Sequence, residues 1–125
     1  MTRKFSSTSV ETTLASGINS SATSMTVASG TGSALLGGVT LAAGNVDQFT
    51  VALDPDTSSE EIVFITATSS DTFTISRGQA GTSAIAHSAG ATVRHVLTSS
   101  DLNAFESGLV NEQQTIPTAF LYMGA

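Results

Sequence analysis

The chain contains no cysteine among its 125 residues, so disulfide bonds and thiolate metal sites are excluded. No apolar run approaches the roughly 20 residues that a membrane-spanning helix needs, and no membrane partner is expected. The N-terminal residues include Arg3 and Lys4 but no continuous apolar stretch after them, which disfavours a secretory signal peptide. A chain of this length predicts one domain with a single core.

Charged residues are also scarce, at 11% of the chain against about 25% in an ordinary domain. Lysine and arginine total four and the net charge is −6, so the clustered basic patch that binds nucleic-acid phosphates is missing. Serine and threonine are abundant instead. A surface rich in hydroxyl groups suits a protein that other subunits partly cover.

Short runs of alternating apolar and polar residues predict β-strands separated by turns. Residues 49–53 alternate as in a half-buried strand, whereas the continuous apolar run within 61–66 predicts a strand buried on both faces. A turn at 69–71 joins the second of these to a strand over 72–76 in a hairpin. Further strands are expected at 8–14, 24–28 and 91–97, a weak one at 39–43, and loops at 29–38 and 77–91.

Thr98, followed three residues later by Asp101, is close to a capping box and predicts the start of a helix. The sequence thus predicts an all-β fold, a small antiparallel β-sandwich or barrel with one short C-terminal helix and extended termini. The expected organisation is an N-terminal arm over 1–12, a β-domain over 13–98, a helix over 99–112 and an apolar tail over 113–125.

Asp54, Asp56, Glu60 and Glu61 form an acidic cluster, a composition that glycosidases and calcium sites also use. The full calcium-loop pattern is missing, and Pro55 with the following serines favours a turn. No serine lies in a Gly-x-Ser-x-Gly elbow, so hydrolase chemistry has no nucleophile to build on. No catalytic residue is predicted.

Arg77 is an isolated cation, and we expect it to pair with Glu60, Glu61 or Asp71 on the neighbouring strand, or with backbone carbonyl groups. Gly-x-x-Gly follows it without a lysine or a helix, so a phosphate loop is not predicted. The two histidines lack metal-ligand spacing and a third ligand, and loop-pinning hydrogen bonds are expected of them. No metal or cofactor is predicted. The expected structural loop residues are Arg77, Gly78, Gly81, His87 and His95.

Residues 60–105 also contain a specific order of short motifs. These are Glu61 in its apolar run, Thr74-Ile75-Ser76-Arg77-Gly78, Gly81-Thr82, Ala86-His87 and the stretch from Gly90 to Leu102. This order resembles a module found in structural proteins of tailed bacteriophages. Residues 12–30 look like the opening strand pair of that family, so the resemblance covers residues 12–105. It implies a virion component without catalytic residues: a minor tail, fibre-base or neck protein, or a head-decoration (cement) subunit.

The chain ends are the expected contacts with other virion proteins of the tail, neck or major capsid, because a monomer rarely leaves apolar segments in water. An arm can add backbone pairing to a neighbour's sheet edge, and an apolar tail can act as an anchor. By analogy with the family, a homotrimer is expected. A carbohydrate-binding β-module for host attachment is the alternative, although the chain has one tyrosine and no tryptophan. The expected interface residues are Phe5, Val10, Ile116, Phe120, Leu121, Tyr122 and Met123.

Overall fold

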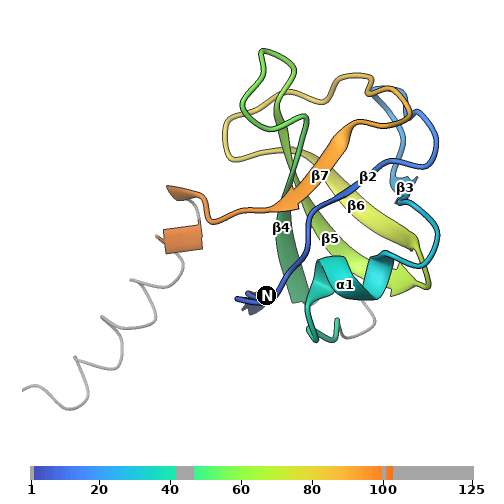
Figure 1. Ribbon diagram of the computed structural model, residues 1–125. Helices are drawn as coiled ribbons and strands as arrows, with labels where there is room; N and C mark the ends of the chain where they lie inside the picture. The colour runs from blue at the N-terminus through green and yellow to red at the C-terminus, as the bar shows by residue number, and fades with distance from the viewer. Residues whose placement is uncertain (1, 42–46, 100, 103–125) are drawn as a thin grey trace, which may run out of the picture.

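A single curled sheet dominates the computed structural model, which describes residues 2–41, 47–99 and 101–102. The strands follow the order β2-β7-β4-β5-β6-β3, and β1 pairs with β4 outside this path (Figure 1). Among these pairings only β1 with β4 is parallel, and the predicted all-β fold is confirmed. The elements are β1 (Thr2–Lys4), β2 (Thr12–Thr13), β3 (Ser24–Thr26), α1 (Gly32–Leu36), β4 (Asp47–Leu53), β5 (Glu61–Ser69), β6 (Thr72–Gln79) and β7 (Thr92–His95).

The two ends of the strand path are joined, so the sheet closes into a small barrel. Leu14 and Val27, which follow β2 and β3, form an antiparallel bridge. Beside this bridge the Ala15 N–H donates to the Thr26 carbonyl oxygen at 2.9 Å. Closure pairs the strand edges that an open sheet would leave available for aggregation.

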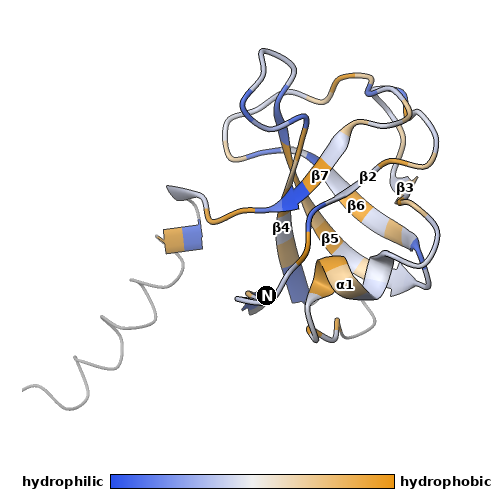
Figure 2. Ribbon diagram, in the orientation of Figure 1, coloured by the Kyte–Doolittle hydropathy of each residue, from blue (hydrophilic) through white to orange (hydrophobic). Residues whose placement is uncertain are grey.

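The core lies inside this barrel. Figure 2 shows hydrophobic residues alternating along the strands and gathered on α1, with the loops at the opposite end more hydrophilic. The largest fully buried apolar side chains come from different elements, so the core joins distant parts of the chain. They are Phe49, Phe73, Met25, Leu35, Leu53 and Ile65.

The β5–β6 hairpin has the predicted form. Its turn places Ser70 in the left-handed region, with φ 55°, and pairs Ser69 with Thr72. Strand β5 is buried on both faces from Glu61 to Thr66, as the continuous apolar run predicts. The predicted strands at 8–14, 24–28 and 91–97 are present but shorter, the strand predicted at 49–53 begins two residues earlier, and residues 39–41 of the weakest one are not in a strand.

Strand β4 departs from the prediction, because it is buried on both faces instead of one. Thr50 on the outer face is only 1% exposed, since its hydroxyl donates to the Asp101 carboxylate at 2.9 Å. The residue that covers this face is 51 positions away in the sequence, so the local alternation could not reveal it.

Helix α1 was missed, because the glycines and serines of residues 29–38 predicted a loop. Leu35 and Leu36 of the helix are buried in the core. At the N-terminal end the Asp71 carboxylate accepts the N–H groups of Gly30 and Gly32, both at 2.9 Å. These two hydrogen bonds lower the pKa of Asp71. The helix therefore depends on a partner in the β5–β6 turn.

The N-terminal arm runs along the chain's own body. Strand β1 occupies the edge of β4 beside the part that pairs with β7, and the arm then crosses the end of α1. There the hydroxyl groups of Ser6 and Thr8 donate to the Gly37 carbonyl oxygen at 2.9 and 3.0 Å, and the Val10 N–H donates to the Ala34 carbonyl oxygen. The N-terminal arm was predicted to pair with the sheet of a neighbouring subunit. Its residues 2–4 instead pair with β4 of the same chain.

Gly37 tests this packing of the arm, because a Cβ there would lie 2.7 Å from the Ser9 backbone nitrogen. We expect Gly37→Ala to lower the free energy of unfolding in urea by about 2 kcal/mol more than Gly38→Ala does. Gly38 is the matched control: it also has a positive φ, but a Cβ there would contact nothing within 4 Å. Equal losses in the two variants would contradict the packing.

Candidate functional site

The loops at the end of the barrel opposite α1, at the top of Figure 1, converge on one buried carboxylate. Glu61 is the first residue of β5, and its side chain is fully buried. Its two oxygens accept five hydrogen bonds, at 2.8 to 3.1 Å. The donors are Arg77 Nε and Nη2, the backbone N–H groups of Gly78 and Ile85, and His87 Nε2.

Arg77 from β6 binds Glu61 through two nitrogens, in the planar bidentate geometry that only arginine provides. Its remaining contacts are with backbone carbonyl oxygens. Nη1 donates to Asn19 at 2.7 Å and to Ala22 at 3.0 Å, and Nη2 donates to Ile85 at 2.6 Å. One guanidinium group thus fixes the loop before β3 and the loop after β6 against the start of β5.

His87 completes the network and is itself buried. Its ring lies between two carboxylates, with Nδ1 2.7 Å from Asp54 Oδ2 and Nε2 2.9 Å from Glu61 Oε1. Each ring nitrogen thus contacts one carboxylate, so His87 links the turn after β4 to the start of β5.

The pKa of Glu61 reflects these hydrogen bonds. Burial by itself raises the pKa, but the hydrogen bonds from Arg77, His87 and two backbone N–H groups outweigh it and lower the pKa from 4.5 to about 2. Glu61 is therefore held as a carboxylate throughout the physiological pH range.

The predicted acidic cluster does not form a site with two facing carboxylates. Glu61 lies inside the barrel and Asp54 binds His87, whereas Asp56 and Glu60 are exposed. Both Asp54 and Asp56 have left-handed backbone conformations, with φ 51° and 63°, and Glu60 accepts the Asp56 N–H at 3.3 Å. The segment is a turn, as its proline and serines predict. Within the described ranges no group of three or more candidate ligands could hold a metal ion.

The two glycines after Arg77 shape the loop that returns to Glu61. Gly78 has φ 57° and donates its N–H to Glu61, and a Cβ there would lie 3.1 Å from the Ala84 nitrogen, which is closer than an ordinary van der Waals contact. Gly81 has φ 82°, and the Thr82 hydroxyl beside it accepts the Ile62 N–H at 2.9 Å. The two glycines thus shape a turn, and the Gly78 N–H binds a carboxylate of the same chain.

His95 lies apart from His87, near the N-terminal arm. Its Nδ1 donates to the Thr50 carbonyl oxygen at 2.7 Å, and its Nε2 accepts the Ser6 N–H at 3.3 Å. The ring stacks on Phe49 with centroids 4.0 Å apart. This histidine connects the arm to β4.

Asp101 forms a second buried carboxylate site, and the predicted capping box is present there. The Thr98 hydroxyl accepts the Asp101 N–H, and the Asp101 carboxylate accepts the Thr98 N–H at 3.0 Å. The same carboxylate binds Thr50 and pairs with Arg3, whose guanidinium lies 4.4 Å above the Phe64 ring. Burial raises the pKa of Asp101, but hydrogen bonds from Thr98, Arg3 and Thr50 outweigh it, so the pKa is lowered.

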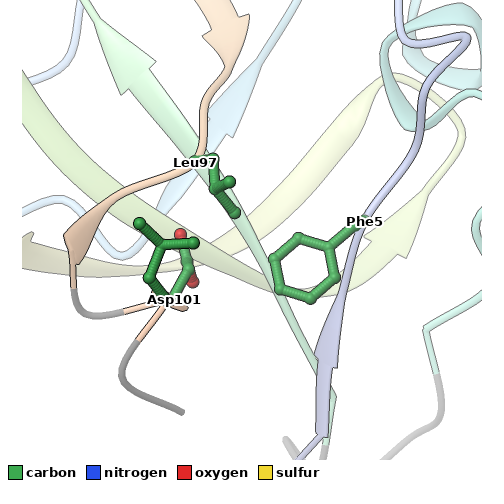
Figure 3. Close-up of a pocket in the computed structure, with 4 residues that line it drawn as sticks. Phe5, Leu97 and Asp101 are labelled. Atoms are coloured by element: carbon green, nitrogen blue, oxygen red, sulfur yellow. The ribbon is translucent and has the colours of Figure 1, made fainter. Parts of the chain in front are cut away.

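An apolar pocket of about 220 Å³ lies next to Asp101, lined by Phe5, Leu97, Asp101 and Leu102. Its three apolar side chains are exposed: Phe5 by 43%, Leu97 by 60% and Leu102 by 48%. Figure 3 shows the Phe5 ring and the Leu97 side chain pointing toward one another from the arm and from the segment after β7. Sequence reasoning selected Phe5 but missed Leu97 and Leu102, which it placed only within the strand expected at 91–97 and the helix expected over 99–112.

Other candidate interface residues have different positions. Val10 is 57% exposed but does not line the pocket. Residues 103–112, which make up most of the predicted helix, lie outside the described residues. So do five predicted interface residues: Ile116, Phe120, Leu121, Tyr122 and Met123.

In comparisons with known proteins, no family model matches the chain and no curated protein matches it. Among the described residues, no helix has the length and apolar character needed to cross a membrane.

Acid should weaken the network in a way that depends on Glu61. Because its folded pKa is below its ordinary value of 4.5, the stabilisation from ionised Glu61 is complete above that pH and is lost as pH falls toward 2. We expect the stability difference between wild type and Glu61→Gln to narrow by about 3 kcal/mol between pH 6 and pH 2, measured by urea unfolding. Glu60→Gln, at the exposed neighbouring position, should follow the wild-type curve. A gap that stays constant with pH would refute the assignment.

Arg77→Lys tests the geometry of the guanidinium group at constant charge. A lysine ammonium cannot reproduce the bidentate pair together with the three carbonyl contacts, so we expect a loss of about 3 kcal/mol in the free energy of unfolding. The matched control is Arg94→Lys, because Arg94 forms exposed ion pairs with Glu11 and Asp56 and should tolerate the change. Thermal unfolding that responds equally to both substitutions would contradict the role of Arg77.

Proposed function

We propose that the protein is a non-enzymatic structural component of a tailed-phage virion, which docks onto tail, neck or capsid proteins through its termini. Attachment to the head as a decoration protein is the alternative location within the same class. The proposal rests on the motif order that resembles a phage structural module, together with the features of the fold that follow.

The observation that carries the proposal is where the exposed apolar residues lie. Phe5, Leu97 and Leu102 gather around one pocket, at the place where the N-terminal arm meets the start of the C-terminal segment. Beyond Leu102 the sequence continues to the apolar residues between Ile116 and Met123. Apolar groups concentrated at one end, on a chain with few charges, are typical of a surface that another protein covers.

The chemistry of the buried network supports a structural function for the motif residues. The Glu61 side chain already binds Arg77 and His87, and the remaining Arg77 nitrogen binds backbone carbonyl oxygens. A general base or nucleophile needs free hydrogen-bonding capacity directed at a substrate. These residues instead use their capacity to hold three loops together, as a module that serves as a scaffold requires.

Assembly of like copies around a symmetry axis is part of the proposal, with a trimer as the expected state. Each copy would supply its apolar C-terminal residues as an anchor, and aromatic residues are enriched in such anchors. The low content of Lys and Arg fits protein partners better than nucleic acid.

Truncation at Pro117 tests the anchor. The core residues and the sheet pairings of the described residues all lie before Pro117, so we expect the shortened chain to fold with the wild-type circular dichroism spectrum. We also expect it to lose occupancy on particles that lack the protein, measured by quantitative gel analysis after co-sedimentation. Full-length Thr118→Ala is the control and should bind. Full occupancy by the truncated chain would remove the anchor from the proposal, and failure of the full-length protein to bind any phage particle would remove the virion assignment itself.

A further inference from the structure

The pocket beside Asp101 has an apolar lining. Its volume of about 220 Å³ exceeds the cavity of about 150 Å³ that is known to accept a benzene ring. Three of its four lining residues are apolar and exposed. The fourth, Asp101, already binds Arg3, Thr50 and Thr98 through its carboxylate. A polar ligand would therefore find no free partner, whereas an aromatic side chain would find three apolar walls.

The same chain contains a segment with matching chemistry. Residues 116–123 read Ile-Pro-Thr-Ala-Phe-Leu-Tyr-Met, which includes two aromatic side chains and no charge. Phe120 suits the pocket better than Tyr122, because the phenol hydroxyl would need a hydrogen-bond partner that the apolar walls do not offer.

Residues 103–115 link the pocket to the segment at 116–123, and this covalent link favours binding of the segment to the pocket of its own chain. Leu102 lines the pocket, and residues 103–115 separate it from the segment, so the connection starts at the pocket wall. Fully extended, it would span about 45 Å, which is far more than a return to the same site requires. A tether of this length gives an effective concentration of order mM, which exceeds the concentration of separate copies in dilute solution.

We propose that in the free protein residues 116–123 dock into the Phe5–Leu97–Leu102 pocket of their own chain, with Phe120 as the inserted side chain. Docking covers the exposed apolar residues of both partners before assembly. Binding to another protein then exchanges this intrachain contact for an intermolecular one. The inference concerns the isolated protein, so it does not depend on the virion function.

Tyr122 reports on docking without a label, because the chain has one tyrosine and no tryptophan. In the wild type we expect its fluorescence to be protected from iodide quenching relative to a peptide of residues 116–125. Leu97→Asp should reduce the docked-to-undocked ratio by about tenfold and make Tyr122 accessible. Val10→Asp is the matched control: Val10 is equally exposed but does not line the pocket, so protection should remain. Circular dichroism establishes that both variants fold.

Cross-linking identifies which copy supplies the segment. The chain has no native cysteine, so the substitutions Ser99→Cys, close in sequence to Leu97 and Asp101 of the pocket, and Thr118→Cys introduce the sole reactive thiols. With a short bismaleimide, the double variant should cross-link within one chain, and a mixture of the two single variants should give no covalent dimer. The proposal is overturned if Tyr122 is as accessible in the wild type as in the peptide, or if Leu97→Asp leaves it protected. A cross-link that forms only between chains overturns it as well, because the occupant is then a second copy.

Discussion

The fold depends on the buried contacts of Glu61 with Arg77 and His87. Three loops at one end of the barrel have few apolar residues of their own, so hydrophobic burial alone cannot order them. The network orders them by directing the backbone carbonyl and N–H groups of these loops to one pair of opposite charges. A buried ion pair often adds little net stability over apolar residues of the same shape, but it tolerates few alternative arrangements. Here that selectivity fixes the loop conformation.

The strand pattern and the capping box could be predicted from the sequence, since both depend on neighbours along the chain. Alternation at Phe73 and Ile75, and the Thr98–Asp101 spacing, are local signals that the structure reproduces. The burial of Thr50 and helix α1 depend on contacts with Asp101 and Asp71, which are distant in sequence, so no local pattern could reveal them. Arg77 was correctly expected to pair with a neighbouring acid, but the choice of Glu61 and its link to His87 required the fold.

The two ends of the barrel have different chemistry, and this difference organises the proposals. At the end of the Glu61 network the polar groups bind one another, which leaves little capacity for a ligand. The arm and the segment after β7 instead present apolar side chains to solvent around a pocket. The same short chain thus combines a rigid set of loops with a surface suited to contact.

The contact between Arg3 and Asp101 has a consequence for the order of folding. It joins residues 98 positions apart, and β1 pairs with β4 from the same arm. During synthesis the first strand emerges from the ribosome early but lacks one of its main partners until almost the whole described chain has been made. The β4–β5–β6 meander can form before that time, because its pairings are local. The amino terminus therefore gains its ionic partner after the strands of the meander have been made, and a nascent chain halted before residue 101 would leave Arg3 without Asp101.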